Sequence, residues 1–269
     1  MSVRIERPAD FVAELVMDRP EAMNAISTDQ ARAIGDACDA LAADDDIRVV
    51  IVSSAVDRAF CVGADLKERA GFSHDDLREQ RPITRRAYGG VLNLPMPTVA
   101  AVDGFALGGG CELALSCDLI VASESAVFAL PEVGVGLIPG GGGTPLLSRR
   151  VGWNAAADLI FTTRRVSADE AFRIGLADRV AAPGAARDTA VELATTIAAH
   201  SPVGLRQAKI ALRRGFDTDL ASGMEIEDAA WAATAFSADR VEGIAAFTEK
   251  RRPRWPGSPA GSDPSPRPR

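Results

Sequence analysis

The chain has 269 residues, of which 47% are hydrophobic, so it can bury the core of one large domain, with or without a small appendage. Its formal net charge of −7 disfavours generic binding to nucleic acids or anionic membranes, which are themselves negatively charged. The most apolar stretch is interrupted by Asp103, Glu112 and Asp118, so no membrane span is expected. The charged first ten residues contain no signal-peptide pattern.

The cysteines and histidines do not predict a metal site. None of the four cysteines pair as CxxC, and His74 lies far along the chain from His200. Buried, reduced thiols are expected instead, which agrees with a cytoplasmic protein.

The first two hundred residues alternate strand and helix patterns. Apolar runs at Val3–Arg7 and Phe11–Met17 flank a proline-containing turn and predict a β-hairpin. Ser27 begins a capping-box pattern and therefore a helix, which ends at the three aspartates from Asp44. Three continuous apolar runs predict strands buried on both faces: Val49–Val52, Pro97–Val102 and Leu119–Ala122.

The remaining elements are mostly helical. A helix is expected between Leu107 and Ser116, and a second capping box at Ser167 begins another that stops near Gly175. Three more helices are predicted after Ser201-Pro202: one around Leu205–Leu212, then Leu220–Ala235 and Ser237–Lys250. The predicted organisation is an α/β core over 1–200, a helical region over 201–252 and a Pro-rich, disordered tail over 253–269.

Three glycine-containing segments carry the candidate chemistry: Ala59–Glu68, Asp103–Leu113 and Leu130–Thr144. In the first two, a strand runs through a glycine turn into a helix, where backbone N–H groups are exposed to an anionic ligand. The second and third each carry a glutamate. Two carboxylates beside exposed N–H groups can move protons while an oxyanion is stabilised.

Each glutamate has a structural alternative when it is considered alone. Glu112 is expected in the first turn of a helix, where an acidic residue is also simply a favourable helix start. Glu132 follows Pro131, and an apolar surround there would favour a protonated acid, although a surface turn would also accommodate it.

Other catalytic motifs fail on spacing. A dinucleotide-binding GxGxxG would need glycine at Pro139, and no GxxxxGK[ST] or GxSxG occurs. His200 beside Ser201 is better explained as a helix start than as part of a nucleophilic pair.

Taken in order, the three segments resemble the crotonase family of enoyl-CoA hydratases and isomerases, over nearly the whole chain up to about Trp255. The resemblance implies a spiral of ββα units with a helical C-terminal trimerisation region, in a homotrimer or a hexamer built as a dimer of trimers. It also implies an acyl-CoA substrate and no separate cofactor, because coenzyme A is part of the substrate.

The resemblance also implies roles for individual residues. The N–H groups of Ala64 and Gly109 would form the oxyanion hole for the thioester carbonyl. Glu112 would activate water, and Glu132 would protonate C2. The implied substrate- and CoA-binding residues are Ala64, Asp65, Leu66, Lys67, Gly109, Gly140 and Lys250. For Lys250 a solvated helix-end cation is an equally good explanation.

The implied reaction is hydration of a 2-enoyl-CoA to a 3-hydroxyacyl-CoA, in fatty-acid or branched-chain amino-acid breakdown. Details of the segments favour methylglutaconyl-CoA hydratase-like members, and double-bond isomerisation is an alternative. An RNA-binding role rests only on family analogy and on a cluster of arginines, and the negative charge argues against it. The cluster comprises Arg78, Arg81, Arg85 and Arg86. One of these could pair with a substrate carboxylate, or all could form a solvated helix face.

Overall fold

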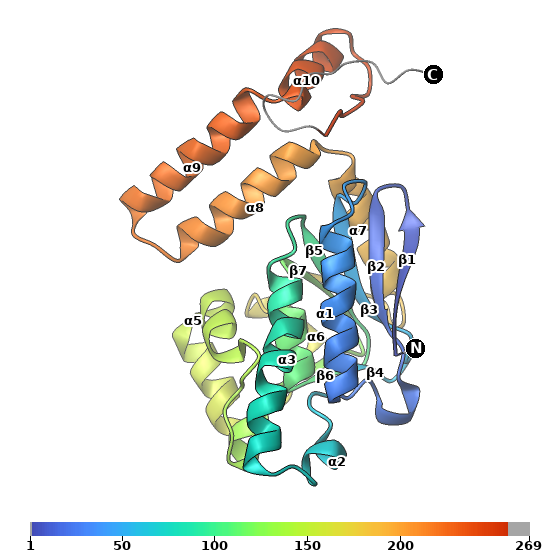
Figure 1. Cartoon of the computed structure of the whole chain (residues 1–269), viewed down its shortest axis with the longest axis vertical. Coiled ribbons are helices and arrows are strands. Elements are labelled where there is room, and N and C mark those ends of the chain that lie inside the picture. Colours follow the sequence, from blue (N-terminus) through green and yellow to red (C-terminus); the bar gives the residue numbers. More distant parts are fainter. Residues whose placement is uncertain (1, 258–269) are drawn as a thin grey trace. The chain divides into compact units, whose positions relative to one another are not determined.

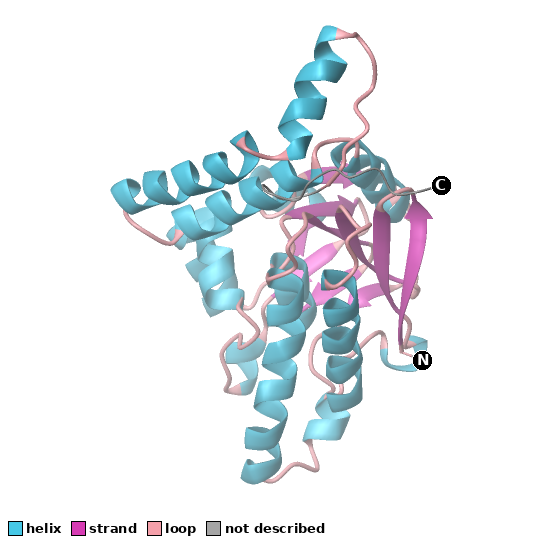
Figure 2. Cartoon of the chain, turned by 45° about the horizontal axis from the view of Figure 1, so that its top comes forward, coloured by secondary structure: helices cyan, strands magenta, loops and turns pink. Residues whose placement is uncertain are grey.

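The computed structural model describes residues 2–257 (Figures 1 and 2). They fall into two compact units, which are considered separately. Of the described residues, the first unit contains 2–94 and 98–195, and the second contains 95–97 and 196–257. The predicted α/β class of the chain is confirmed.

The strands of the first unit form two sheets. The six-stranded sheet has the order β1-β2-β3-β5-β7-β10, and the four-stranded sheet has the order β4-β6-β8-β9. The strands are β1 (Val3–Ala9), β2 (Val12–Met17), β3 (Val49–Ser54), β4 (Ala59–Cys61), β5 (Thr98–Val102), β6 (Phe105–Leu107), β7 (Leu119–Ser123), β8 (Val127–Ala129), β9 (Val166–Ser167) and β10 (Arg179–Ala181).

The large sheet confirms the predicted hairpin and the three predicted buried strands. β1 and β2 pair antiparallel, whereas β2, β3, β5, β7 and β10 are parallel to one another. β2 and β5 are buried at every residue. This is why their sequences are continuous apolar runs rather than alternating ones.

Three consecutive pairs of strands each contribute one strand to the large sheet and one to the small sheet. β3, β5 and β7 each enter the large sheet, and the strand that follows each of them, β4, β6 or β8, enters the small one. A helical segment follows each pair: α2 (Leu66–Arg69), α4 (Gly109–Leu115) and the 3₁₀ helix η2 (Glu132–Val135). This repetition is the spiral of ββα units that the sequence predicted.

Three helices of the first unit begin at serine side-chain caps, two of them where the sequence predicted a capping box. Ser27 accepts a hydrogen bond from the Gln30 N–H at the start of α1 (Thr28–Ala42), and Ser167 accepts one from the Glu170 N–H at the start of α6 (Ala168–Arg173). α3 (His74–Leu92) begins with a full capping box at Ser73 and lies beside α1 (Figure 1). The remaining helices are η1 (Pro20–Ala22), α5 (Gly143–Thr162) and α7 (Ala186–Ala198).

The second unit is helical. Its helices are α8 (Pro202–Phe216), α9 (Leu220–Ala235) and α10 (Ala238–Thr248), close to the predicted ranges. α8 and α9 run side by side (Figure 2).

Residues 253–257, which the sequence assigns to a disordered tail, form hydrogen bonds within the second unit. The Trp255 indole N–H donates to the Ala199 carbonyl, and the Gly257 N–H donates to the Asp239 carboxylate. These hydrogen bonds tie residues 253–257 to the second unit despite their Pro-rich composition. The rest of the predicted tail, 258–269, lies outside the described residues.

Candidate active site

The three glycine-containing segments meet at one edge of the small sheet. β4, β6 and β8 are adjacent and parallel, so their carboxyl ends lie together. Ala64 follows β4, Gly109 follows β6, and Glu132 follows β8. Segments that lie up to 68 residues apart in the sequence therefore converge because each occupies the same position in its own ββα unit.

Two backbone N–H groups at this edge are left free to bind a ligand. Ile26 forms a parallel bridge to Ala64, but the bonds run through the neighbours: the Ile26 N–H donates to the Gly63 carbonyl, and the Asp65 N–H donates to the Ile26 carbonyl. Gly109 is the first residue of α4, whose first-turn N–H groups have no acceptor within the helix. Neither the Ala64 nor the Gly109 N–H donates a hydrogen bond to any described residue.

The two N–H groups lie close together because glycine occupies the contact between their segments. Gly63 has a φ of +93°, and a Cβ placed on it would lie 2.8 Å from the Leu107 carbonyl oxygen and 3.1 Å from the Gly109 nitrogen. An L-residue would be strained at this φ and would push the two segments apart. The glycine thus allows the segment that carries the Gly109 N–H to approach the segment that carries the Ala64 N–H.

Glu112 is held rigidly beside this pair. It lies in α4, is only 3% exposed, and its Oε1 accepts hydrogen bonds from the Gly141 N–H at 2.6 Å and the Gly143 N–H at 2.8 Å. Burial raises its pKa above the ordinary value, while these backbone N–H groups oppose the rise by stabilising the charged form. The glycines after Pro139 therefore position this carboxylate.

Glu132 is a carboxyl group without such support. Its Oε2 is buried without a hydrogen-bond partner among the described residues, and its Oε1 lies over Gly108, 2.8 Å from where a Cβ would be. Burial, and next the negative charge of Glu112, raises its pKa to about 7. Two neighbouring carboxyls thus differ in environment. The charge of Glu112 is stabilised by amides, whereas Glu132 still holds its proton in about half of the molecules at neutral pH, which suits a base and an acid.

Tyr88 is a site residue that the sequence did not identify. It is the single tyrosine of the chain and lies on α3. A Cβ on Gly109 would overlap its hydroxyl oxygen, and a Cβ on Gly141 would lie 2.7 Å from its ring. Burial and the charge of Glu112 raise its pKa well above the ordinary value, so the hydroxyl stays protonated. The only available signal was helical spacing: Arg81, Thr84 and Tyr88 fall on one face of α3.

The residues expected to bind coenzyme A lie in different surroundings. The Asp65 carboxylate caps α2 and pairs with the Arg19 guanidinium at 2.8 Å, so it fixes the loop that follows Ala64. Leu66 and Lys67 are exposed in the first turn of α2, and Gly140 precedes the amides that hold Glu112. Lys250 is exposed and belongs to the second unit.

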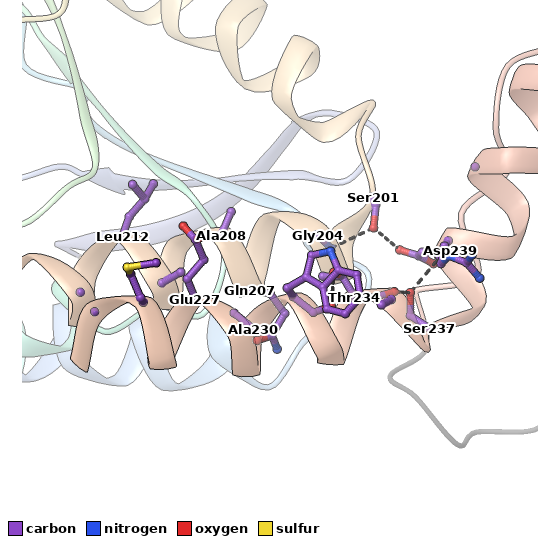
Figure 3. Close-up of a pocket in the computed structure, with 18 of the residues that line it drawn as sticks. Ser201, Gly204, Gln207, Ala208, Leu212, Glu227, Ala230, Thr234, Ser237 and Asp239 are labelled. Carbon is purple, nitrogen blue, oxygen red and sulfur yellow. Dashed lines mark hydrogen bonds between the residues drawn. The ribbon is translucent and has the colours of Figure 1, made fainter. Parts of the chain in front are cut away.

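The second unit contains a hollow of its own, between α8, α9 and α10. Its walls are mainly apolar, and Ser201, Ser237 and Asp239 lie at one end, where Ser201 hydrogen-bonds to Asp239 (Figure 3). It contains none of the residues proposed for catalysis. Over residues 2–257 there is no group of three or more His, Cys, Asp and Glu side chains that could hold a metal ion, and no helix long and apolar enough to cross a membrane.

Comparison with known proteins agrees with this geometry. The model of the family described as enoyl-CoA hydratase/isomerase matches residues 8–258. The chain is 44% identical over 248 residues to the putative enoyl-CoA hydratase/isomerase YngF of Bacillus subtilis, covering 92% of this chain and 95% of that protein. It is 41% identical over 250 residues to the human mitochondrial methylglutaconyl-CoA hydratase, covering 91% and 74%.

Solved structures give the same result. The enoyl-CoA hydratase from Bacillus anthracis superposes with a TM-score of 0.93 at 37% identity, covering 96% of this chain and 100% of that one. The Mycobacterium tuberculosis enoyl-CoA hydratase gives a TM-score of 0.87 at 34% identity, covering 96% and 99%. The predicted resemblance is confirmed: the chain belongs to the enoyl-CoA hydratase/isomerase family, with the crotonase fold.

Proposed function

We propose that this enzyme hydrates 2-enoyl-CoA thioesters to 3-hydroxyacyl-CoA. The observation that carries the proposal is the pair formed by an amide-stabilised Glu112 and a Glu132 whose pKa is raised to about 7, beside the free N–H groups of Ala64 and Gly109. The names of relatives and the family match support the wider class of hydratase and isomerase.

The two N–H groups bind the thioester carbonyl oxygen, on which negative charge develops as the reaction proceeds. Donors of this kind contribute about 3 to 4 kcal/mol each to transition-state stabilisation. Both come from the backbone, so they require no particular side chain at position 64.

The carboxyls carry the protons. Glu112 accepts a proton from water as the water oxygen bonds to C3, and Glu132 gives its proton to C2. The sum is one water added across the double bond. Afterwards Glu112 is protonated and Glu132 is ionised, and proton exchange with solvent restores the starting state. The reaction needs no cofactor beyond the coenzyme A of the substrate.

The direct test follows the absorbance of the conjugated thioester of crotonyl-CoA, with mass spectrometry of the product. We expect the absorbance to fall and the product to gain the mass of one water. If crotonyl-CoA, longer 2-enoyl-CoA and methylglutaconyl-CoA are all unchanged, hydration is refuted.

Double-bond isomerisation is the competing chemistry, because moving a proton from C2 to C4 of a 3-enoyl-CoA requires only one of the carboxyls. A pair of carboxyls, one suited to act as a base and the other as an acid, favours hydration. Rates of hydration and of the 3-to-2 shift on substrates of equal chain length separate the two, and a faster shift would reverse the assignment.

We also propose that the enzyme is a trimer, or a hexamer of paired trimers, joined through the second unit. Large apolar side chains are exposed on its helices, among them Leu212, Leu220 and Phe247, which are 74%, 81% and 87% exposed. Exposed apolar groups of this size commonly mark protein contacts. Light scattering should give three or six times the chain mass of 28.2 kDa, and a monomer would refute this.

The remaining parts of the proposal are the pathway and the location. We propose a role in fatty-acid or branched-chain amino-acid breakdown, in the cytoplasm. The bacterial relative YngF supports the location. Growth of a deletion strain on fatty acids and on leucine would test the pathway, and cell fractionation would test the location.

A further inference from the structure

Three of the four arginines of α3 are distinguished by what they contact. Arg78 pairs with Asp75 on the exposed face, and Arg86 pairs with Asp36 and Asp39 of α1. These ion pairs are reason enough for Arg78 and Arg86 to lie where they do on the surface. The guanidinium of Arg81, by contrast, forms no ion pair with a carboxylate among the described residues.

Arg81 is exposed to solvent at the edge of the proposed active site. Its Nη1 is 3.0 Å from the position of a Cβ on Gly140, the residue next to the Gly141 amide that holds Glu112. The pKa of Glu112 reflects this: burial raises it most, and the Arg81 charge is among the influences that lower it. Arg81 is also seven residues before Tyr88, so both project from one face of α3 toward the glycines at 140 and 141.

The position of Arg81 along a bound substrate follows from the proposed function, on which this inference rests. The thioester oxygen lies at Ala64 and Gly109, and C2 and C3 lie at the two glutamates. On this placement we assign the acyl chain beyond C3 to the side of Glu112, where Gly140 and Arg81 lie, and coenzyme A to the opposite side of the thioester.

We propose that Arg81 binds a carboxylate at the far end of the acyl group, so that the preferred substrates are 2-enoyl-CoA thioesters that end in a carboxylate. A guanidinium presents paired N–H donors that match both oxygens of a carboxylate, and it is always charged. An alkyl end offers the guanidinium no acceptor, so a carboxylate end is bound in preference to it.

The test compares two five-carbon substrates, glutaconyl-CoA, which ends in a carboxylate, and 2-pentenoyl-CoA, which ends in a methyl group. The readout is the ratio of their kcat/KM values. We expect the wild type to prefer glutaconyl-CoA, and Arg81→Gln to lower the ratio about 10- to 100-fold, the range for losing a hydrogen bond to a charged group. Arg81→Lys should retain only part of the preference, because lysine keeps the positive charge but lacks the paired N–H donors of the guanidinium.

Arg85→Gln is the matched control. It is an exposed arginine on the same helix, four residues later, and it should leave the ratio unchanged. Any effect of Arg81→Gln on Glu112 acts on both substrates and cancels in the ratio. A phosphate of coenzyme A is the other anion that Arg81 could bind, and in that case both substrates would weaken equally. An unchanged ratio therefore refutes the proposal.

Binding of unreactive analogues separates this inference from the proposed reaction. Glutaryl-CoA and pentanoyl-CoA lack the double bond, and their dissociation constants can be measured by calorimetry. A preference of the wild type for glutaryl-CoA that Arg81→Gln removes supports the carboxylate site even if no hydration is found. Equal affinities in the wild type overturn it even if hydration is fast.

Discussion

Replacing Glu132 with glutamine should lower activity and raise stability in the same pH range. Glutamine has nearly the shape of a protonated glutamate but cannot ionise or give up the proton. Because the Glu132 carboxyl is buried beside Glu112 with one oxygen unpaired, its ionisation in the folded protein is unfavourable. The substitution removes that cost together with the proposed acid.

The size of the effect follows from the pKa. A rise from 4.5 to about 7 means that the folded protein holds this proton over a range in which the unfolded chain has lost it. The stabilisation is complete below pH 4.5 and is lost as the pH rises through 7. At about 1.4 kcal/mol per pKa unit, and with partial exposure allowed for, wild-type stability should fall by about 2 to 3 kcal/mol across this range relative to Glu132→Gln.

Urea unfolding at pH 5 and pH 8 measures this difference, at one protein concentration because association adds to stability. We expect nearly equal stability at pH 5 and a more stable variant at pH 8. Glu79→Gln changes the same charge at an exposed position of α3 and controls for net charge.

Kinetics provide the second measurement. In the wild type, kcat/KM should decline above about pH 7 as the free enzyme loses the Glu132 proton. Glu132→Gln should be slower by about 10²- to 10⁴-fold and should not show that decline. A variant that keeps wild-type turnover, or whose stability difference is the same at both pH values, would refute the reasoning.

Three further substitutions have defined outcomes. Glu112→Gln can still accept the two glycine N–H bonds but cannot take a proton. Its circular dichroism spectrum should therefore be unchanged, while turnover should fall about 10²- to 10⁴-fold. Near-normal turnover of this variant would show that Glu112 takes no part in the mechanism. Gly109→Ala should lower the melting temperature, at a cost of about 1 to 3 kcal/mol of stability, because the new Cβ overlaps the Tyr88 hydroxyl. Adding Tyr88→Phe should recover part of this loss. If the stability changes of the two substitutions simply add, the contact between the two residues is contradicted. Arg187→Ala should destabilise the fold by about 1 to 3 kcal/mol in urea, because it leaves the fully buried Glu14 carboxylate without its half-exposed charged partner. A loss under about 0.5 kcal/mol, the least expected for a lost hydrogen bond, would show that Glu14 does not depend on Arg187.

Parts of the fold could be predicted because their signals are local. The parallel strands are buried on both faces, so Val49–Val52 and Leu119–Ala122 had to be continuous apolar runs. The caps at Ser27 and Ser167 are side-chain bonds to residues three positions ahead. The small sheet could not be predicted, because strands of two or three residues are too short to show a period.

The sequence by itself determined the residue types of the site: two glutamates, and glycines that expose amides after strands. It also determined the family, through the order of the three segments. It could not give the properties that distinguish the two glutamates. The amides that hold Glu112 come from 29 and 31 residues away. The pKa of Glu132 is raised first by burial in the folded chain and then by the charge of Glu112.

Only the tertiary structure decided which polar groups of α3 face the site. Tyr88 is buried, and Arg81 is exposed but lies against Gly140. Both share their helix with arginines that pair with carboxylates instead, and nothing local separates the two sets. The separation arises because α3 packs one face against the glycines that follow β6 and β8. Helical position fixes which residues share a face, but only the packing of distant segments determines what that face contacts.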